Sequence, residues 1–240
     1  MITIRKNFFA RTRNFTRACA IWTRIISVST ATLSLLWGPF VPAFASDNTL
    51  PSGGVVESGS ISINAVSDSH LRIDQSTESG IINWREFSVG SSSRVEFAQP
   101  SASSSTLNRV TGSQVSEIRG KIDAIGRVIL VNPAGVLFTA SAEVNVGSII
   151  ASTLDISTED FLDGRLLFSG ESTNAVINQG KIRVANGEYI AMVGARIVNQ
   201  GELVAPSGSA LLAAGSRVRL DMGGPLQIEV ESGALEAHIE

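Results

Sequence analysis

The sequence predicts an all-β protein: a right-handed parallel β-helix, or single-stranded solenoid, with an N-terminal β cap and short hairpins outside the helix. Three observations support this fold class. A motif recurs at an offset of 21 residues, and fixed periods near 20 residues are typical of solenoids. The strand-like segments are short and are separated by Gly, Ser and Asn. Helical periodicity is almost absent after the first 45 residues.

Residues 1–45 have the features of a signal peptide with an extended basic region, which would direct the chain to the Sec translocon. All six of their charged residues are basic, and the apolar run at residues 25–37 is too short for a membrane span, which needs about 20 residues. Ala43 and Ala45 form the small-x-small pattern that signal peptidase recognises, so we expect cleavage between Ala45 and Ser46. A retained membrane anchor or an incorrectly assigned start is the alternative, because the basic region is unusually long.

Removing this leader changes the charge of the chain. The sequence has 19 basic and 22 acidic residues, and without the six basic residues of the leader 13 remain against 22, a net charge of −9. This negative charge argues against nucleic acid as a partner. The single cysteine, Cys19, lies in the leader, so the exported part has no disulfide and depends on its own hydrophobic core.

Strand-like segments fill the rest of the chain. Ile61, Ile63 and Ala65 alternate with polar residues, as do Leu71 and Ile73, which is typical of half-buried strands. Further strands are predicted at residues 95–98, 118–124, 144–150, 166–169 and 226–230. Only residues 156–163 have the pattern of a helical turn.

Residues 128–138 comprise an apolar strand, a tight turn and a second apolar strand. Asn132, Pro133 and Gly135 occupy the first, second and fourth corners, where a type I turn prefers these residue types. Pro133 also favours an extended backbone at Asn132. The apolar flanks do not alternate with polar residues, which indicates strands that are covered on more than one side.

An internal repeat defines the architecture further. Residues 177–182 (INQGKI) recur as residues 198–203 (VNQGEL), and at the same offset Gly187, Gly194 and Arg196 match Gly208, Gly215 and Arg217. A third, imperfect copy begins at Gly120 and leads into the turn at Asn132. At about 3.3 Å per residue, one repeat spans about 70 Å of extended chain, enough for a coil of three short strands. A leucine-rich repeat is the main alternative, but its L-x-x-L-x-L signature is missing.

Six ordered segments resemble the two-partner secretion (TPS) domain, or filamentous haemagglutinin N-terminal domain, of large exported Gram-negative proteins. They are residues 81–90 (IINWREFSVG), 95–100 (VEFAQP), 107–112 (LNRVTG), 116–120 (SEIRG), 131–138 (VNPAGVLF), and 144–147 (VNVG) with 151–153 (AST). The family turn usually reads Asn-Pro-Asn-Gly, whereas Ala134 fills its third corner here. A second Asn-Pro motif of some adhesin members is also missing.

The resemblance implies a secretion module and not an enzyme. Residues 46–170 would form the secretion domain core, and residues 171–240 would add further coils. Such proteins cross the inner membrane through Sec, and an Omp85-type outer-membrane β-barrel with periplasmic POTRA domains then recognises them and exports them to the cell surface. The chain would be a fragment of a longer adhesin, haemolysin or toxin, or a naturally short exoprotein. A host-cell or glycan ligand would bind a region beyond residue 240.

The resemblance also assigns roles to single residues. The secretion motif would comprise Asn132, Pro133, Ala134, Gly135, Asn108 and Arg109. The turn is either recognised by the transporter or needed only for folding, and Arg109 is alternatively a solvated charge beside a strand. The spacing of Trp84 and Phe87 predicts one buried and one exposed ring, packed in the core or the cap. Asn178 and Asn199 hold equivalent repeat positions, so we expect a stacked ladder of amides.

A secreted polysaccharide-active enzyme, such as a lyase, is the alternative from a different class, because pectin-active enzymes also use parallel β-helices. Its site would need converging carboxylates, often with calcium. The acidic cluster in the sequence comprises Asp155, Glu159, Asp160 and Asp163. Its spacing does not match an EF-hand, and a solvated loop is expected. His70 and His238 are isolated in the sequence, so we predict no catalytic, cofactor or metal site.

Overall fold

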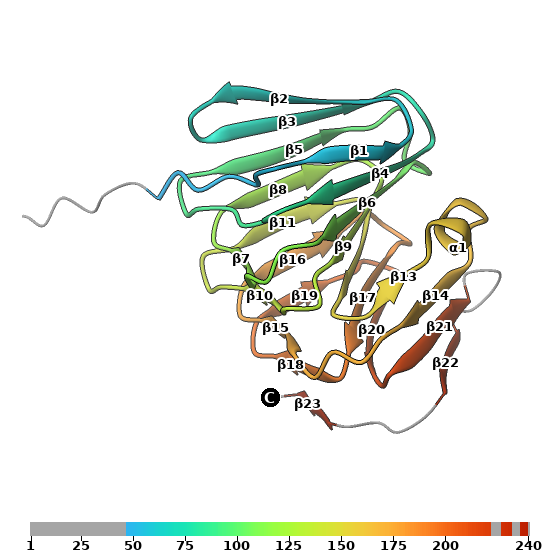
Figure 1. Cartoon of the computed structure of the whole chain (residues 1–240). Coiled ribbons are helices and arrows are strands. Elements are labelled where there is room, and N and C mark those ends of the chain that lie inside the picture. The colour runs from blue at the N-terminus through green and yellow to red at the C-terminus, as the bar shows by residue number, and fades with distance from the viewer. Residues whose placement is uncertain (1–46, 222–226, 232–235, 240) are drawn as a thin grey trace, which may run out of the picture. The chain divides into compact units, whose positions relative to one another are not determined.

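The computed structural model describes residues 47–221, 227–231 and 236–239 (Figure 1). Strands predominate in this part of the chain, and its one α-helix, α1 (Thr158–Leu162), lies within the predicted helical turn. Successive strands enter three sheets in turn, and most of them pair in parallel with the equivalent strand of the next coil. The predicted parallel β-helix is therefore confirmed.

Three sheets form the walls of the helix. Sheet 1 contains, in spatial order, β1 (Val55–Ser58), β4 (Ser79–Trp84), β6 (Ser105–Val110), β9 (Arg127–Val131), β12 (Ser148–Ser152), β17 (Tyr189–Gly194) and β20 (Ser209–Ala214). Sheet 2 contains β7 (Ser116–Ile118), β10 (Val136–Phe138), β15 (Ala175–Asn178), β18 (Arg196–Asn199) and β23 (Glu236–Ile239). Sheet 3 contains β2 (Ile61–Ser67), β3 (His70–Gln75), β5 (Arg94–Ala98), β8 (Lys121–Ala124), β11 (Glu143–Val146), β16 (Lys181–Val184) and β19 (Glu202–Val204).

Antiparallel strands form a cap at the N-terminal end of the helix. β1 pairs antiparallel with β4, and β2 pairs antiparallel with β3, whereas β4 and β3 pair in parallel with the coils that follow. The alternating segments at Ile61 and Leu71 belong to the β2–β3 hairpin. An antiparallel neighbour ends a parallel stack, because it turns the chain back without a crossover connection.

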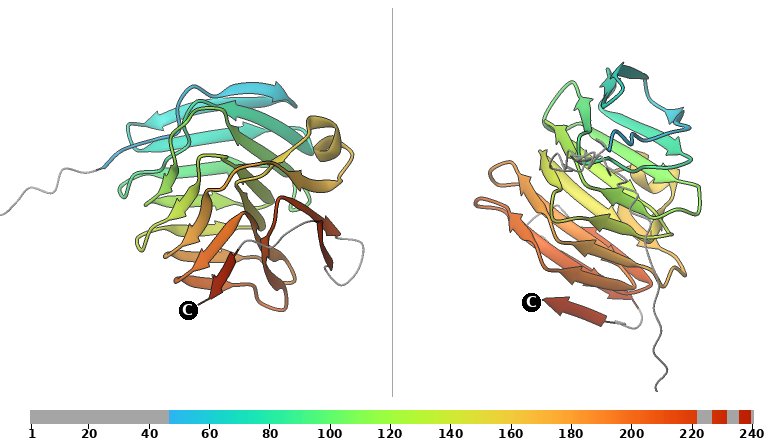
Figure 2. Two further views of the ribbon diagram at one scale, coloured as in Figure 1. Left: turned by 60° about the horizontal axis from the view of Figure 1, so that its bottom comes forward. Right: turned by 90° about the vertical axis from the view of Figure 1, so that its left-hand side faces the viewer.

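Two excursions leave the helix at equivalent corners, between a strand of sheet 1 and the next strand of sheet 2. The first follows β12 and carries β13 (Asp155–Ile156), α1 and β14 (Leu166–Ser169). The second follows β20 and carries β21 (Arg217–Asp221) and β22 (Gln227–Glu231). Because β14 pairs antiparallel with β21, the two excursions build one four-stranded outer sheet, β13-β14-β21-β22 (Figures 1 and 2).

The second excursion corrects the prediction from the repeat. Arg196 and Arg217 match in sequence, yet Arg217 lies in the outer sheet and Arg196 pairs with Glu236 of β23. The repeat is interrupted because Val218 and Leu220 are buried in the outer layer and not inside the helix.

Two predicted strands also prove to be pairs of strands. The segment 118–124 breaks at Gly120 between β7 and β8, and the segment 144–150 breaks at Gly147 between β11 and β12. A side chain at Gly147 would collide with the backbone of the coil beneath, at the carbonyl of Ile125. Glycine therefore marks corners where stacked coils come closest.

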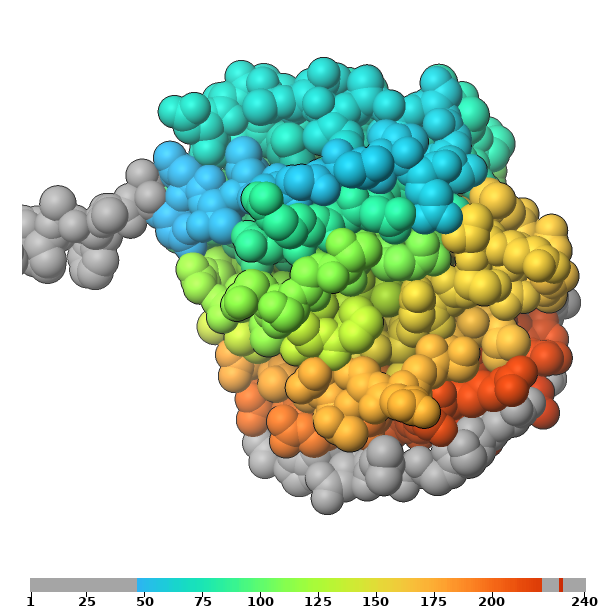
Figure 3. Space-filling model, in the orientation of Figure 1, coloured from blue at the N-terminus to red at the C-terminus, as the bar shows by residue number. Residues whose placement is uncertain are grey.

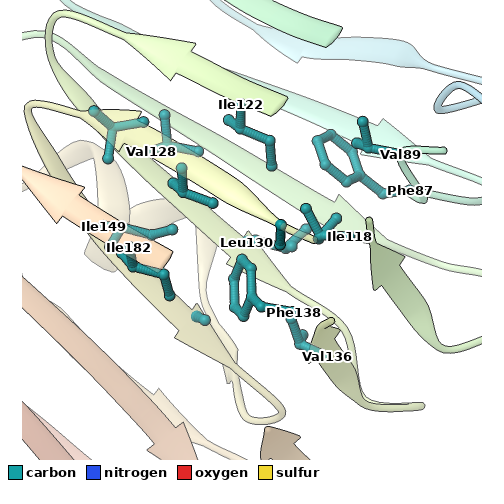
Figure 4. Packing of buried hydrophobic residues seen from close by; sticks show 14 of the residues in the cluster. Phe87, Val89, Ile118, Ile122, Val128, Leu130, Val136, Phe138, Ile149 and Ile182 are labelled. Carbon is teal, nitrogen blue, oxygen red and sulfur yellow. The ribbon is translucent and has the colours of Figure 1, made fainter. Parts of the chain in front are cut away.

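Apolar side chains fill the interior of the helix. Val128 and Leu130 of β9 point inward and join residues of all three sheets, among them Ile118 and Ile122 (Figure 4). Phe138 of β10, the strand that follows β9, lies in the same cluster and is fully buried. Each coil thus buries its apolar residues against its neighbours.

Sheet 1 is buried on its other face as well. Leu107, Ile129 and Ile150 are neighbours across β6, β9 and β12, and all are fully buried on the outward side of the sheet. They form a second core with Phe168 and Val218 of the outer sheet. This two-sided burial explains why the apolar residues of β9 do not alternate with polar ones, as the sequence predicted.

Replacing Ile129 tests the second core. We expect Ile129→Ala to lower the free energy of unfolding by about 2–5 kcal/mol, because the substitution leaves a cavity between sheet 1 and the outer sheet. Ile125→Ala is the matched control, since Ile125 is 57% exposed and should change stability by less than about 0.5 kcal/mol. Denaturant unfolding measures both, and equal losses would contradict a buried outer face of sheet 1.

Candidate functional site

The turn at Asn132 joins β9 of sheet 1 to β10 of sheet 2, so it is a corner of the helix. The Gly135 amide donates to the Asn132 carbonyl at 2.9 Å, which closes the turn. The Asn132 side-chain Oδ1 accepts from the Ala134 amide, also at 2.9 Å. Gly135 has a φ of 120°, which favours glycine at this position. The backbone of the predicted turn is therefore fixed by its own residues.

The amide group of Asn132 also bonds the coil beneath. Its Nδ2 donates to the Gln114 carbonyl and to Ser116 Oγ, each at 2.9 Å, and the residue is fully buried. Within the turn, Pro133 is exposed and Ala134 is half-buried. The polar side chain of this motif consequently faces the protein and not the solvent.

Asn108 lies inside the helix on β6. Its Oδ1 accepts from Trp84 Nε1 at 3.0 Å, and its Nδ2 lies 3.3 Å from the Ile129 carbonyl of the next coil. Trp84 and Phe87 are both buried and pack edge to face, with ring centroids 5.5 Å apart. The expectation that one ring is exposed is wrong, because Phe87 follows the end of β4, where strand alternation no longer applies.

Arg109 points to the outer face of sheet 1 and is largely buried, with 14% of its side chain exposed. It forms ion pairs with Glu57 of β1 and Asp155 of β13, each at 3.0 Å, and donates to the Ile156 carbonyl at 2.8 Å. The alternative of a solvated charge is therefore wrong. Sequence reasoning missed Glu57, because the partners are far apart in the chain and no spacing links them.

Asn178 and Asn199 lie in register on β15 and β18. Asn178 Nδ2 donates to Asn199 Oδ1 at 2.8 Å. Gly180, which follows in the same motif, has no room for a side chain beside the Ala142 backbone. The repeated Asn-Gln-Gly motif thus combines an amide contact between coils with a corner that requires glycine.

The described chain begins with an anchored segment that sequence reasoning also missed. Asp47 accepts from Thr49 Oγ1 and from Arg119 Nη1, each at 2.6 Å. The bond from Thr49, and then the one from Arg119, lowers the pKa of Asp47 from 3.8 to about 2. The Ser92 amide donates to the Asp47 carbonyl at 3.1 Å. The proposed cleavage residues Ala45 and Ser46 lie outside the described residues.

The acidic cluster does not converge on a common point. Asp155 pairs with Arg109, whereas Glu159, Asp160 and Asp163 all pair with Arg165. Residues 47–221, 227–231 and 236–239 contain no group of three or more His, Cys, Asp or Glu side chains placed to hold a metal ion. No helix in these ranges is long and apolar enough to cross a membrane.

Removing the Asn132 side chain should destabilise the folded domain. Asn132→Ala removes the hydrogen bonds to the buried Ser116 hydroxyl and to the Ala134 amide, so we expect a loss of about 1–3 kcal/mol in the free energy of unfolding. Asn186→Ala, in an exposed turn, is the control and should cost less than about 0.5 kcal/mol. Denaturant titration measures both, and a neutral Asn132→Ala would contradict this structural role.

Acid should release the anchored segment. A carboxylate whose pKa is lowered in the folded state stabilises that state above its unfolded pKa and loses this effect as the pH falls. For Asp47 this stabilisation should be lost between about pH 4 and pH 2. The measurement is hydrogen exchange at the Gly90 and Ser92 amides, which should become faster after correction for the pH dependence of the intrinsic exchange rate. Asp47→Asn should show no such transition. Unchanged protection of the unmodified chain down to pH 2 would refute the anchor.

Comparison with known proteins places this geometry in context. The TPS secretion domain family matches residues 45–238. A heme/hemopexin-binding protein of Haemophilus influenzae (strain ATCC 51907 / DSM 11121 / KW20 / Rd) is 32% identical over 212 residues, which cover 82% of this chain. Another heme/hemopexin-binding protein of Haemophilus influenzae is 35% identical over 114 residues, which cover 48% of this chain. The chain spans 23% of the first relative and 12% of the second.

The fold is also similar to a solved secretion domain. The crystal structure of the HMW1 secretion domain from Haemophilus influenzae superposes with a TM-score of 0.73 at 29% sequence identity. The alignment covers 79% of this chain and 52% of that one. The family match covers residues 45–238 and the fold is similar to a secretion domain of known structure, so the chain belongs to the TPS secretion domain family.

Proposed function

We propose that this chain directs the export of an exoprotein across the outer membrane of a Gram-negative bacterium. A TPS domain implies an outer-membrane transporter as partner, and we propose an Omp85-type β-barrel whose POTRA domains bind the chain in the periplasm. The leader would first carry the chain through the Sec translocon, and signal peptidase would cut between Ala45 and Ser46. The observation that carries this proposal is the family match over residues 45–238.

The geometry of the motif favours recognition before folding. In the folded domain Asn132 and Asn108 are fully buried, and their side chains bond to protein groups. Only Pro133 and Ala134 of the turn reach the surface. An unfolded chain instead presents all of these side chains, and its backbone can add as a strand to the edge of a partner's sheet. We infer that the transporter binds the motif in this extended state.

Folding outside the cell then opposes return through the transporter. Burial of the interior core and of the second core removes apolar side chains from water. Each completed coil also offers a parallel edge to the next one, so folding can proceed along the chain as it emerges. The same residues would therefore serve first as an export signal and then as structural parts of the β-helix.

The names of the relatives do not transfer directly to this chain. Both are named for binding heme and hemopexin, but the matched region is 23% of the first and 12% of the second. We propose that residues 45–238 supply the export signal, and that a host-cell or glycan ligand of an adhesin-like exoprotein binds another region. The family match does not favour the polysaccharide lyase. The carboxylates of the acidic cluster also pair with two different arginines, Arg109 and Arg165, and do not converge.

Export of two matched variants separates recognition from folding. We expect Asn132→Ala to lower secretion through the cognate transporter by about tenfold, equivalent to about 1.4 kcal/mol of lost binding. Asn178→Ala is the control, because it also removes a buried amide that bonds the next coil. Secreted and periplasmic fractions are measured by immunoblot after the stabilities of both variants are determined.

Three outcomes of this experiment would count against the proposal. If Asn132→Ala and Asn178→Ala were equally stable and showed equal export defects, Asn132 would have a role in folding only. Normal export of Asn132→Ala would exclude its role in recognition. Secretion of the unmodified chain in cells without the transporter would contradict the proposed function itself.

A further inference from the structure

The cap strand β1 is weakly held by apolar contacts. Val55 is 65% exposed and Val56 is 36% exposed, and Ser58 is only half-buried. Glu57 lies where the register with β4 shifts, between Val56 and Ser58. Such an irregularity redirects a side chain, and here it turns the Glu57 carboxylate toward neighbouring polar groups. β1 therefore depends on its backbone pairing with β4 and on the bonds of Glu57.

The carboxylate of Glu57 joins three separate segments. Its Oε2 accepts from Asn83 Nδ2 of β4 at 2.7 Å and from Arg109 Nη1 of β6 at 3.0 Å. Its Oε1 accepts from Thr158 Oγ1 of α1 at 2.6 Å. The bonds from Thr158 and Asn83, followed by the charge of Arg109, lower the pKa of this carboxylate. Glu57 thus remains charged at neutral pH and bonds the first excursion directly.

Arg109 makes the same connection from the other side. Its Nε pairs with Asp155, and its Nη2 donates to the Ile156 carbonyl, so one guanidinium contacts both the cap and the excursion. In Figure 3 the yellow first excursion lies directly against the blue and cyan N-terminal strands. Glu57 and Thr158 are 101 residues apart in the chain.

We propose that Glu57, Arg109, Asp155 and Thr158 form a latch that makes the N-terminal cap and the outer sheet stable as one unit. When residues 155–158 are not yet folded, Glu57 lacks the Thr158 bond and Arg109 lacks its bonds to Asp155 and Ile156. β1 then detaches more often and exposes the edge of β4, which is an unpaired strand edge at the end of the stack. The latch closes only after the first excursion docks.

The contrary interpretation treats these contacts as independent surface bonds. Exposed ion pairs contribute little, and their loss would affect only the segment that carries them. The two interpretations differ in whether a change in β1 affects α1 and a change in α1 affects β1. A latch couples β1 and α1, so that a change in one segment loosens the other, whereas independent bonds show no such coupling.

Hydrogen exchange on the full chain tests the latch. Thr158→Val leaves every atom of β1 in place, and we expect the β1 amides to exchange about tenfold faster. Glu57→Ala, which removes both carboxylate oxygens, should in turn accelerate the amides of residues 158–163 by about tenfold. Because both substitutions break the same bond, the double variant should exchange no faster in either segment than the faster single variant.

Arg94→Gln is the matched control. Arg94 forms ion pairs with Glu96 and Asp123, which lie on the same strand and on the adjacent strand of sheet 3, so the substitution leaves the contacts of β1 and α1 intact. It should leave exchange in β1 and α1 unchanged. Acceleration confined to the mutated segment would overturn the proposal, as would equal acceleration of β1 by Arg94→Gln. The Thr158→Val result decides the question even if substitutions of Arg109 prevent folding, since Thr158 is a half-buried residue at the start of α1.

Discussion

The two-sided burial of sheet 1 is the constraint on which the rest of this structure depends. Its inward side chains complete the interior of the helix, and its outward column of Leu107, Ile129 and Ile150 must be covered as well. The cover comes from two excursions that are far apart in sequence and pair through β14 and β21. The stack of coils therefore cannot bury all of its apolar surface until residues 217–221 have joined it, and its stability is a property of the whole domain.

Local patterns in the sequence were sufficient to predict the coil, and hairpins outside the helix were expected, but the positions of these excursions were not predicted. The turn at Asn132 and the β-helix follow from residue types and spacing within a few residues or one repeat. The repeat also equates Arg217 with Arg196, and this is wrong because the second excursion begins between them. The chain leaves the β-helix at this point because Val218 and Leu220 cover the outward face of sheet 1. That face exists only in the folded structure, so the sequence alone does not reveal it.

The candidate site shows the same division. The residue types at Asn132 and Gly135 predicted the turn, since their bonds lie within the motif or one coil away. The environment of Arg109 could not be predicted, because Glu57 and Asp155 approach it only through the cap and the first excursion. Burial of Phe87 was also not predicted, because this residue lies beyond the end of β4, where strand alternation no longer applies. Long-range polar contacts leave no periodic trace in a sequence, so their partners have to be read from the fold.

Burial of the motif in the folded domain means that, in the proposed mechanism, the transporter binds the chain before it folds. A transporter that reads Asn108 and Asn132 has access to them only in an unfolded chain, and folding removes them from reach. The most direct test compares binding of the purified POTRA domains of the cognate transporter to this chain when folded and when freshly diluted from denaturant. We expect the POTRA domains to bind the unfolded chain, to delay its folding, and to bind the folded chain at least about tenfold more weakly. Equal affinity for both forms would contradict this mechanism.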